Sequence, residues 1–458
     1  MKKLILLLCL IIGNIAFAAD VKILHTSDVH GRIAPITYKD IPNQGGLARR
    51  VQFINDYKKN NNNVLIFDSG DCFQGSLYYR IDYGNAESKL MPEIKYDAIA
   101  LGNHEFDNGE KVLKRLIKNS KTQFLAANVH FKDKYMKKAI KPYIVKEIDD
   151  EKFLIIGVTT SELAKLSNTN YVTVTDASYE IKNIIKNVDY DKLIILSHCG
   201  INEDRKIAKE IPQIDLILGG HNHYFFEQPE YVGNVPIIHD GEFGMRIGIV
   251  DFDEKLKNYS YINITPDIKE NEKISKKVEK IDNHARKTTN KIIANTKDTL
   301  IGDQTTIEHN QTNLGRLVLI SMAQEFDNYD AIITNSGSIR INKNLNGNIT
   351  YADLLEILPF DNDIVLVEVQ GKDLKEILKH GQQTNRRYLQ YYLKDSKIDD
   401  SKIYKVVTNS YIANAKDGYT GFKNCKLIKK SEQSPIKLLQ NTMQNFGTIS
   451  NKKIYEAL

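Results

Sequence analysis

Residues that can bind metal ions follow five short apolar segments in the first half of the chain. The segments are Val21–Leu24, Val64–Phe67, Ala98–Leu101, Leu193–Leu196 and Leu216–Leu218. The metal-capable residues after them are, in chain order, Asp28, His30, Asp71, Asn103, His104, His198, His221 and His223. Carboxylate, imidazole and amide groups without a thiolate suit divalent cations such as zinc, manganese, iron or cobalt. The pattern predicts a metal centre and leaves the identity of the metal open.

A centre of this composition can hold two cations, because a carboxylate can bridge a pair about 3.5–4 Å apart. Such a pair polarises a phosphoryl oxygen and generates hydroxide from water near neutral pH. A single Asp-x-His segment, or a lone histidine after a strand, is usually an ordinary surface or core residue. Five such pieces in order, each after an apolar segment, favour a shared metal centre over coincidence.

The apolar segments have the length and the Ile, Val and Leu content of buried strands. Three further segments of this kind are Phe124–Ala127, Phe153–Val158 and Val235–Ile238. Polar, periodic stretches such as 46–58 and 110–119 lie between them and are typical of helices. The alternation predicts a layered α/β domain, in which the carboxyl ends of neighbouring strands bring their polar residues together.

The chain carries a set of motifs that resembles the signature of calcineurin-like metallophosphoesterases. The set comprises Asp28-x-His30, Gly70-Asp71, Gly102-Asn103-His104-Glu105, His198 and Gly220-His221-x-His223. The longer segments 23–31 and 101–107 are similar to the 5′-nucleotidase family of exported two-domain enzymes. That family includes UDP-sugar hydrolases and 2′,3′-cyclic-nucleotide phosphodiesterases, and the resemblance extends over nearly the whole mature chain.

The resemblance implies an N-terminal four-layer α/β-β/α metallophosphoesterase domain over residues 19–265. The resemblance also implies a C-terminal α+β domain that binds substrate over 296–458, and the sequence between the two domains predicts a linker helix over 266–295. Residues 268–291 are dense in Lys and Glu, with apolar residues at helical spacing, which is typical of a solvated helix. A surface helix of the first domain is the alternative for this stretch. In the last domain, strands are expected at 331–334, 364–369 and 404–408, and helices at 314–325, 351–358 and 372–380.

The resemblance also implies a role for each residue of the centre. One cation would be held by Asp28, His30, Asp71 and His223. The other would be held by Asp71, Asn103, His198 and His221, with Asp71 as the bridge. His104 would face the phosphate and stabilise or protonate the leaving group, and Asp107 would orient it and raise its pKa. His25 and Asp68 would support neighbouring ligands, and His239 is a less favoured ligand candidate.

Motifs at 311–316, 335–340, 358–360 and 417–419 resemble those of the family's C-terminal nucleotide-binding domain. The candidate substrate-binding residues are Asn335, Arg340, Phe360, Asn362, Tyr411 and Asp417. By this resemblance Phe360 and Tyr411 would sandwich a base, a contact that contributes about 1–3 kcal/mol. Asp417 would bind ribose hydroxyls, and Asn335 and Arg340 would hold base or phosphate oxygens. A core position for Phe360 is the alternative.

Two positions depart from the family pattern. Gln304 and Glu308 stand where members of the family often carry two arginines. A glutamate repels a polyphosphate, so either Arg340 and nearby lysines such as Lys416 compensate or the substrate carries less charge.

The predicted function is hydrolysis of nucleoside monophosphates, nucleotide sugars or cyclic nucleotides by in-line attack of metal-bound hydroxide. A thiosulfate-ester hydrolase and a catalytically silent exported binding protein are the alternatives.

Composition narrows the possible partners. Among 458 residues, 63 are Lys or Arg and 58 are Asp or Glu, for a formal charge of +5. This imbalance is small, and no basic stripe with interleaved aromatic residues occurs, so a nucleic-acid polymer is not the expected partner. We expect a small-molecule nucleotide-type substrate and a monomeric protein.

The N-terminus predicts export. Lys2 and Lys3 precede an apolar run over 4–12, and Ala16-Phe17-Ala18 matches a cleavage site, so cleavage is expected after about Ala18. The run is shorter than the roughly 20 residues that span a bilayer. No later segment is apolar enough to span one, so a periplasmic location is predicted.

Cys72 and Cys199 form either a pair or two buried free thiols.

Overall fold

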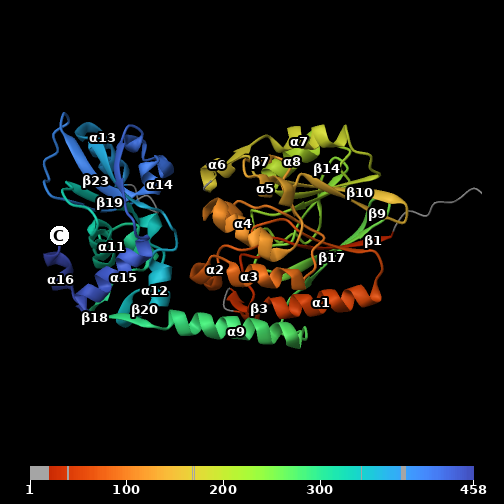
Figure 1. The fold of residues 1–458 in the computed structure, drawn as a ribbon, viewed down its shortest axis with the longest axis horizontal. Coiled ribbons are helices and arrows are strands. Elements are labelled where there is room, and N and C mark those ends of the chain that lie inside the picture. The colour runs from red at the N-terminus through yellow and green to blue at the C-terminus, as the bar shows by residue number, and fades with distance from the viewer. Residues whose placement is uncertain (1–19, 39–40, 168, 170, 342, 383–387) are drawn as a thin grey trace, which may run out of the picture. The chain divides into compact units, whose positions relative to one another are not determined.

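The computed structural model describes residues 20–458 except 39–40, 168, 170, 342 and 383–387, so the predicted signal segment lies outside the described residues. The chain forms two compact units that divide after Asn283 (Figure 1). The division falls inside α9 (Glu272–Thr289), the helix rich in Lys and Glu. Within the part of the chain that the structure describes, no helix is long and apolar enough to cross a bilayer.

Two sheets form the centre of the first unit. The seven-stranded sheet has the order β17 (Leu256–Asn263), β16 (Arg246–Phe252), β1 (Val21–Thr26), β4 (Val64–Asp68), β5 (Ala98–Ala100), β6 (Phe124–Leu125), β8 (Ile140–Lys141). The six-stranded sheet has the order β14 (Glu230–Val232), β15 (Val235–His239), β13 (Leu216–Gly219), β12 (Lys192–His198), β10 (Glu151–Thr159), β9 (Tyr143–Ile148). All eight strands expected in this part of the sequence are present, with ends that differ by up to two residues.

The two sheets pack face to face. Ile23 and Phe67 of the first sheet share a fully buried core with Ile155 and Leu196 of the second. Successive side chains of a strand point to opposite faces, so Leu24 packs in the core on the other side of the first sheet. Burial on both faces explains why these strands read as unbroken apolar segments in the sequence.

Helices cover the outer face of each sheet. The first sheet is covered by α1 (Leu47–Asn60), α3 (Asn85–Leu90) and α4 (Gly109–Ser120), and the second by α7 (Ala177–Ile185) and α8 (Ile201–Glu210). On α1 the buried residues Leu47, Val51 and Ile54 recur at helical spacing. Ile274 and Val278 of α9 pack in the same core as α1. The four-layer α/β-β/α arrangement implied by the resemblance is confirmed.

Strand direction creates the edge where the polar residues meet. β1, β4 and β5 are parallel, and β10, β12, β13 and β15 are parallel in the other sheet. Parallel neighbours end at the same edge of a sheet, so the loops after these strands lie together. The shorter elements of this unit are α2 (Leu77–Asp82), α5 (Lys134–Ala139), α6 (Leu163–Leu166) and two strand pairs, β2 (Ile36–Tyr38) with β3 (Ile41–Gln44) and β7 (Val129–Phe131) with β11 (Val172–Val174).

The second unit is the expected α+β domain. Its five-stranded sheet has the order β22 (Leu389–Leu393), β19 (Ala331–Asn335), β23 (Ile403–Asn409), β21 (Ile364–Gln370), β24 (Lys426–Lys430). A three-stranded sheet has the order β20 (Leu345–Thr350), β18 (Ile292–Leu300), β25 (Thr448–Ile449). Its helices are α10 (Gln304–Ile307), α11 (Asn313–Ala323), α12 (Tyr351–Ile357), α13 (Gly371–His380), α14 (Ser410–Ala413), α15 (Pro435–Phe446) and α16 (Asn451–Glu456). Leu374 and Ile377 of α13 pack against Val367 and Val406 of the larger sheet.

A carboxyl group on α3 makes the stability of the first unit depend on pH. Glu87 is 3% exposed, and only its Oε1 has a hydrogen bond, from Ser76 Oγ at 2.7 Å. Burial raises the pKa of Glu87 from 4.5 to about 8. Since the folded protein holds this proton more tightly than the unfolded chain, the stability that it contributes is complete below about pH 4.5 and is lost as pH rises through 8.

Glu87→Gln is therefore expected to stabilise the protein more at pH 8.5 than at pH 5.5, by about 2–3 kcal/mol. Chemical unfolding at the two pH values, with the same metal loading, measures the difference. Glu279→Gln on the exposed face of α9 is the control, and its effect on the free energy of unfolding should be the same at both pH values. If the stability of Glu87→Gln and that of the unmodified protein depend on pH to the same extent, the pKa of Glu87 is not raised by burial.

Candidate metal centre

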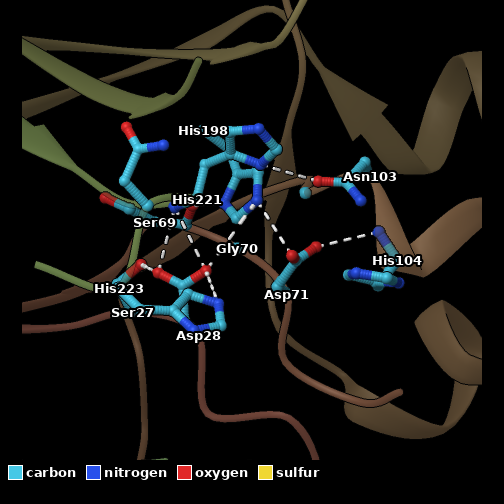
Figure 2. Close-up of polar contacts among 12 residues, drawn as sticks. Ser27, Asp28, Ser69, Gly70, Asp71, Asn103, His104, His198, His221 and His223 are labelled. Carbon is cyan, nitrogen blue, oxygen red and sulfur yellow. Dashed lines mark hydrogen bonds and ion pairs between the residues drawn. The ribbon is translucent and has the colours of Figure 1, made fainter. Parts of the chain in front are cut away.

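Side chains from distant parts of the first unit converge where β1, β4, β12 and β13 end (Figure 2). They form two groups, and in each group the candidate ligand atoms all lie within 4.8 Å of one another. One group is Asp28, His30 and His223, and the other is Asp71, His198 and His221. A carboxylate with two imidazoles is a donor set that suits a borderline divalent cation.

Asp71 belongs to the second group and also faces the first. Its Oδ2 is 3.0 Å from His198 Nε2 in one group and 4.0 Å from His30 Nε2 in the other. The side chain is almost fully buried. An oxygen that faces imidazoles of both groups has the placement that a bridging carboxylate needs. Asn103 joins the second group, with its Oδ1 2.9 Å from His221 Nδ1 (Figure 2).

The inward-facing imidazole nitrogens crowd against carboxylates and against one another. His30 Nδ1 lies 2.6 Å from the Gln74 carbonyl and His198 Nδ1 lies 2.7 Å from the Ser69 carbonyl. A carbonyl only accepts, so each Nδ1 carries a proton and donates it to the backbone, and each Nε2 points inward. His198 Nε2 faces Asp71 Oδ2 at 3.0 Å, and His30 Nε2 is 3.2 Å from His223 Nε2. Imidazole nitrogens that converge beside carboxylates fit a pair of cations, which would take the place of their protons.

Left-handed backbone conformations cluster at these residues. Among the seven candidate ligands, five have positive φ angles: Asp28 (51°), His30 (50°), Asp71 (56°), His221 (78°) and His223 (60°). This region is uncommon for residues other than glycine, and it recurs where a strand end must turn sharply to aim a functional group. The two glycines Gly70 and Gly102 let the loops touch, since a Cβ on Gly102 would lie 2.1 Å from Asp71 Oδ1.

The charges of the centre keep its carboxylates ionised. Burial by itself raises the pKa of Asp71, but nearby His198, His104 and His30 hold that pKa well below its usual value. The pKa of Asp28 is lowered in the same way by His223 and His198, against burial. Burial lowers the pKa of His198, but Asp71 and Asp28 outweigh it and raise the pKa to about 10. Buried carboxylates that need positive charge nearby are what a cation pair would stabilise.

His104 lies beside the two groups and is paired with Asp107. Its Nδ1 is 2.6 Å from Asp107 Oδ2, and its backbone N–H donates to Asp71 Oδ1 at 2.8 Å. Burial lowers the pKa of His104, but Asp71 and Asp107 outweigh it and raise the pKa to about 9. The side chain is 36% exposed, so a protonated imidazole is accessible at the rim of the centre.

Comparison with known proteins agrees with the two-unit architecture. Residues 21–225 match the calcineurin-like phosphoesterase family, and residues 292–394 and 386–424 match the 5′-nucleotidase C-terminal domain. The chain is 28% identical to a 5′-nucleotidase of Homo sapiens, over 97% of this chain and 92% of that protein. A crystal structure of a 5′-nucleotidase precursor from Thermus thermophilus has a TM-score of 0.72 and 27% identity, covering 94% of this chain and 97% of the other.

The chain belongs to the 5′-nucleotidase family of calcineurin-like phosphoesterases. Its family is one of hydrolases that cleave phosphoester bonds, and its metallophosphoesterase fold implies divalent metal ions. It is also 28% identical to the trifunctional nucleotide phosphoesterase protein YfkN of Bacillus subtilis, over 88% of this chain. The match spans only 32% of that longer protein.

In this 5′-nucleotidase-family chain, the candidate substrate residues of the second unit form two sets of contacting residues. Tyr411 Oη donates to Asp417 Oδ1 at 3.0 Å, and Asn335 Nδ2 lies 3.5 Å from Asp417 Oδ2. The Arg340 guanidinium lies 5.5 Å from the centre of the Phe360 ring. Asn362 lines the same small cavity as Phe360. Phe360 is 41% exposed, so the alternative that it is a core residue is wrong.

Other residues singled out from the sequence lie outside the two groups. His239 Nε2 pairs with Asp204 at 2.9 Å and is no part of either group. His25 Nδ1 lies 2.5 Å from Asp240, and its Nε2 lies 2.9 Å from Ser69 Oγ. Asp68 Oδ1 accepts the Gly70 N–H at 2.9 Å and so braces the turn before Asp71.

Cys72 and Cys199 are buried free thiols. Gln304 Nε2 donates to Glu308 Oε1 at 2.7 Å.

Sequence reasoning missed two carboxylates that support the centre. Glu105 accepts the backbone N–H groups of Asp71, Cys72 and Gly102 at 2.7–2.9 Å, which fixes the two ligand loops to each other. Its place in the Gly-Asn-His-Glu motif was a signal for this role. Glu242 Oε2 lies 2.5 Å from His223 Nδ1. No motif marks Glu242, because its partner comes from a loop that precedes it by almost twenty residues.

Proposed function

We propose that this chain is a 5′-nucleotidase-like phosphohydrolase that releases phosphate from nucleotides with the help of two divalent cations. The observation that carries the proposal is Asp71, whose carboxylate faces imidazoles of both groups. When bound, a cation pair supplies a polarised phosphoryl oxygen and an activated water for in-line displacement. The proposed ligands of the pair are Asp28, His30, Asp71, Asn103, His198, His221 and His223.

His104 is the proposed catalytic residue on the leaving-group side. Asp107 Oδ2 accepts from Nδ1, so Nε2 is the nitrogen free to approach substrate and carry a proton. With its pKa raised to about 9, His104 is protonated at neutral pH. An imidazolium can stabilise the growing negative charge on the ester oxygen or give it a proton as the bond to phosphorus breaks. Asp107 keeps the ring oriented.

The second unit supplies the proposed recognition of a nucleoside. Phe360 offers an exposed ring face, and Asp417 presents a carboxylate between Tyr411 and Asn335. A ring stacks on any base, and a carboxylate accepts hydrogen bonds from two ribose hydroxyls. Arg340 beside Phe360 adds a positive charge for base or phosphate oxygens. The expected export to the periplasm and the monomeric state belong to the same proposal and rest on the sequence alone.

A substrate panel tests this function. Metal-loaded protein is expected to release phosphate from AMP, and the panel extends to UDP-glucose, a 2′,3′-cyclic nucleotide, ATP and p-nitrophenyl phosphate, with Mn²⁺, Zn²⁺ and Co²⁺ compared. Release of sulfate from a thiosulfate ester, without phosphate release from any nucleotide, would favour the alternative hydrolase. Absence of turnover on every substrate, with metals bound, would leave only the silent binding protein.

Phe360→Ala is expected to raise KM for AMP about 5- to 100-fold, because a stacked base contributes about 1–3 kcal/mol. Hydrolysis of p-nitrophenyl phosphate, which has no nucleoside, should change less than about twofold, since the metal centre is untouched. Tyr391→Ala is the matched control, because Tyr391 is 42% exposed in the same unit and outside the candidate group. Steady-state kinetics with both substrates checks the prediction. An unchanged KM for AMP would remove Phe360 from the binding site.

A further inference from the structure

The inward-facing imidazoles of the centre differ in the partner that bonds the ring nitrogen pointing away from the centre. His30 and His198 each bond a backbone carbonyl through Nδ1, at 2.6 and 2.7 Å. His223 instead bonds a carboxylate, with Glu242 Oε2 2.5 Å from its Nδ1. A carboxylate fixes the tautomer and orientation of an imidazole and also makes its other nitrogen a stronger donor to a metal. Among the candidate ligands in the part of the chain that the structure describes, His223 is the one whose Nδ1 bonds a carboxylate.

Glu242 sits in a sharp turn that is built against the same group. The turn follows β15 and includes positive φ angles at Gly241 (78°), Phe243 (59°) and Gly244 (62°). The Phe243 N–H donates to the Asp28 carbonyl at 2.8 Å, so the turn is tied to the loop of another ligand. The Phe243 ring lies 6.0 Å from the His30 ring and 6.2 Å from the His223 ring. The turn thus contacts every member of the Asp28, His30 and His223 group.

A tyrosine holds the carboxylate from its other side. Tyr38 Oη donates to Glu242 Oε1 at 3.0 Å. Tyr38 ends β2, so a contact runs from the β2–β3 pair through Glu242 to His223. Each oxygen of Glu242 has its own partner, which leaves the carboxylate little freedom to rotate. Glu242 lies beyond residue 225, where the match to the calcineurin-like phosphoesterase family ends.

We propose that Glu242, braced by Tyr38, is a positioning residue for one of the two cations: it aims His223 Nε2 at the Asp28 and His30 ligand atoms. The inference rests on the proposed function, since it takes these residues as ligands. Its consequence is an asymmetric centre. The site of Asp28, His30 and His223 depends on Glu242, whereas in the other site the Ser69 carbonyl holds His198 and His221 faces Asn103.

Losing such a supporting partner typically weakens metal binding about 10- to 100-fold. Glu242→Gln keeps the shape of the side chain but replaces the charged acceptor with an amide. The variant is expected to bind one cation as tightly as the unmodified protein and the other about 10- to 100-fold more weakly. Tyr38→Phe leaves the carboxylate in place and removes one bond, so we expect a weaker effect, about 2- to 10-fold, at the same site.

The test is a titration of metal-free full-length protein with Mn²⁺, followed by calorimetry and by the electron paramagnetic resonance of bound Mn²⁺. The unmodified protein should bind two equivalents and show a coupled pair, while Glu242→Gln should show an isolated ion at one equivalent. The control is Glu227→Gln, because Glu227 also bonds a tyrosine, Tyr261, but contacts no candidate ligand. Glu227→Gln should match the unmodified protein.

Equal affinity of both sites in Glu242→Gln, or equal weakening of both, would overturn the proposal. Binding of fewer than two equivalents by the unmodified protein would instead contradict the proposed function, so the two failures are distinguishable. Should Glu242→Gln fail to fold, as judged by circular dichroism, Tyr38→Phe carries the test, since it removes only a hydroxyl. In that case, unchanged affinity in Tyr38→Phe would overturn the proposal.

Discussion

Asp71→Ala is expected to lower kcat/KM for AMP by about 10³- to 10⁴-fold and to remove both cations from the purified protein. Metal ions stabilise transition-state charge by several kcal/mol, and each 1.4 kcal/mol is about a tenfold change in rate. Asp71 has this large effect because its carboxylate faces both groups, at 3.0 Å from His198 and 4.0 Å from His30.

Elemental analysis after gel filtration, together with steady-state kinetics, measures both parts of this result. Asp204→Asn is the matched control, because Asp204 is also a fully buried aspartate paired with a histidine, His239, but lies in neither group. The control is expected to keep two cations and to retain activity within about tenfold. Two cations and near-normal activity in Asp71→Ala would contradict the bridging role.

His104→Ala is expected to lower kcat for AMP by about 10²- to 10⁴-fold while both cations stay bound. The effect should depend on the leaving group. A nucleoside alkoxide needs the proton or positive charge that the imidazolium supplies, whereas p-nitrophenolate leaves readily without it. Hydrolysis of p-nitrophenyl phosphate should therefore fall much less than hydrolysis of AMP. Asp107→Asn should give a smaller loss with the same preference, since Asp107 acts through His104.

A comparison of kcat for the two substrates in each variant checks this prediction, with metal content measured in parallel. His130→Ala is the matched control, because His130 also pairs with a carboxylate, Glu180 at 3.4 Å, far from the candidate ligands in sequence and outside both groups. It should behave as the unmodified protein. A loss of the same size on both substrates would assign His104 to phosphate binding rather than to the leaving group.

The strands and their polar ends were predictable because strands that are buried on both faces consist of short, continuous apolar segments. Val21–Leu24 and Leu193–Leu196 each lie inside a longer strand with a candidate ligand at or just beyond its end. Their placement in two packed sheets was not derivable from periodicity and came only from the family resemblance. Exposed strands were not predicted at all: every residue of β24 is exposed, so it lacks the apolar signal.

The residues behind the ligands were the hardest to predict. His223 and Glu242 come from separate loops, and only the packing of β13 beside β15 brings those loops together. Asp240 likewise pairs with His25 across more than two hundred residues. Isolated carboxylates carry no spacing pattern, so their partners appear only once the fold is known. The exposure of Phe360 was equally open, because Leu-Pro-Phe suits a core turn as well as a surface platform.

One carboxylate, that of Asp71, is expected to join the two cations. Anomalous diffraction from crystals of the full chain grown with Mn²⁺ or Zn²⁺ tests it most directly. We predict two anomalous peaks about 3.5–4 Å apart, both in contact with Asp71, one near His30 and His223 and the other near His198 and His221. A single peak, or two peaks of which one lies away from the Asp71 carboxylate, would contradict the account.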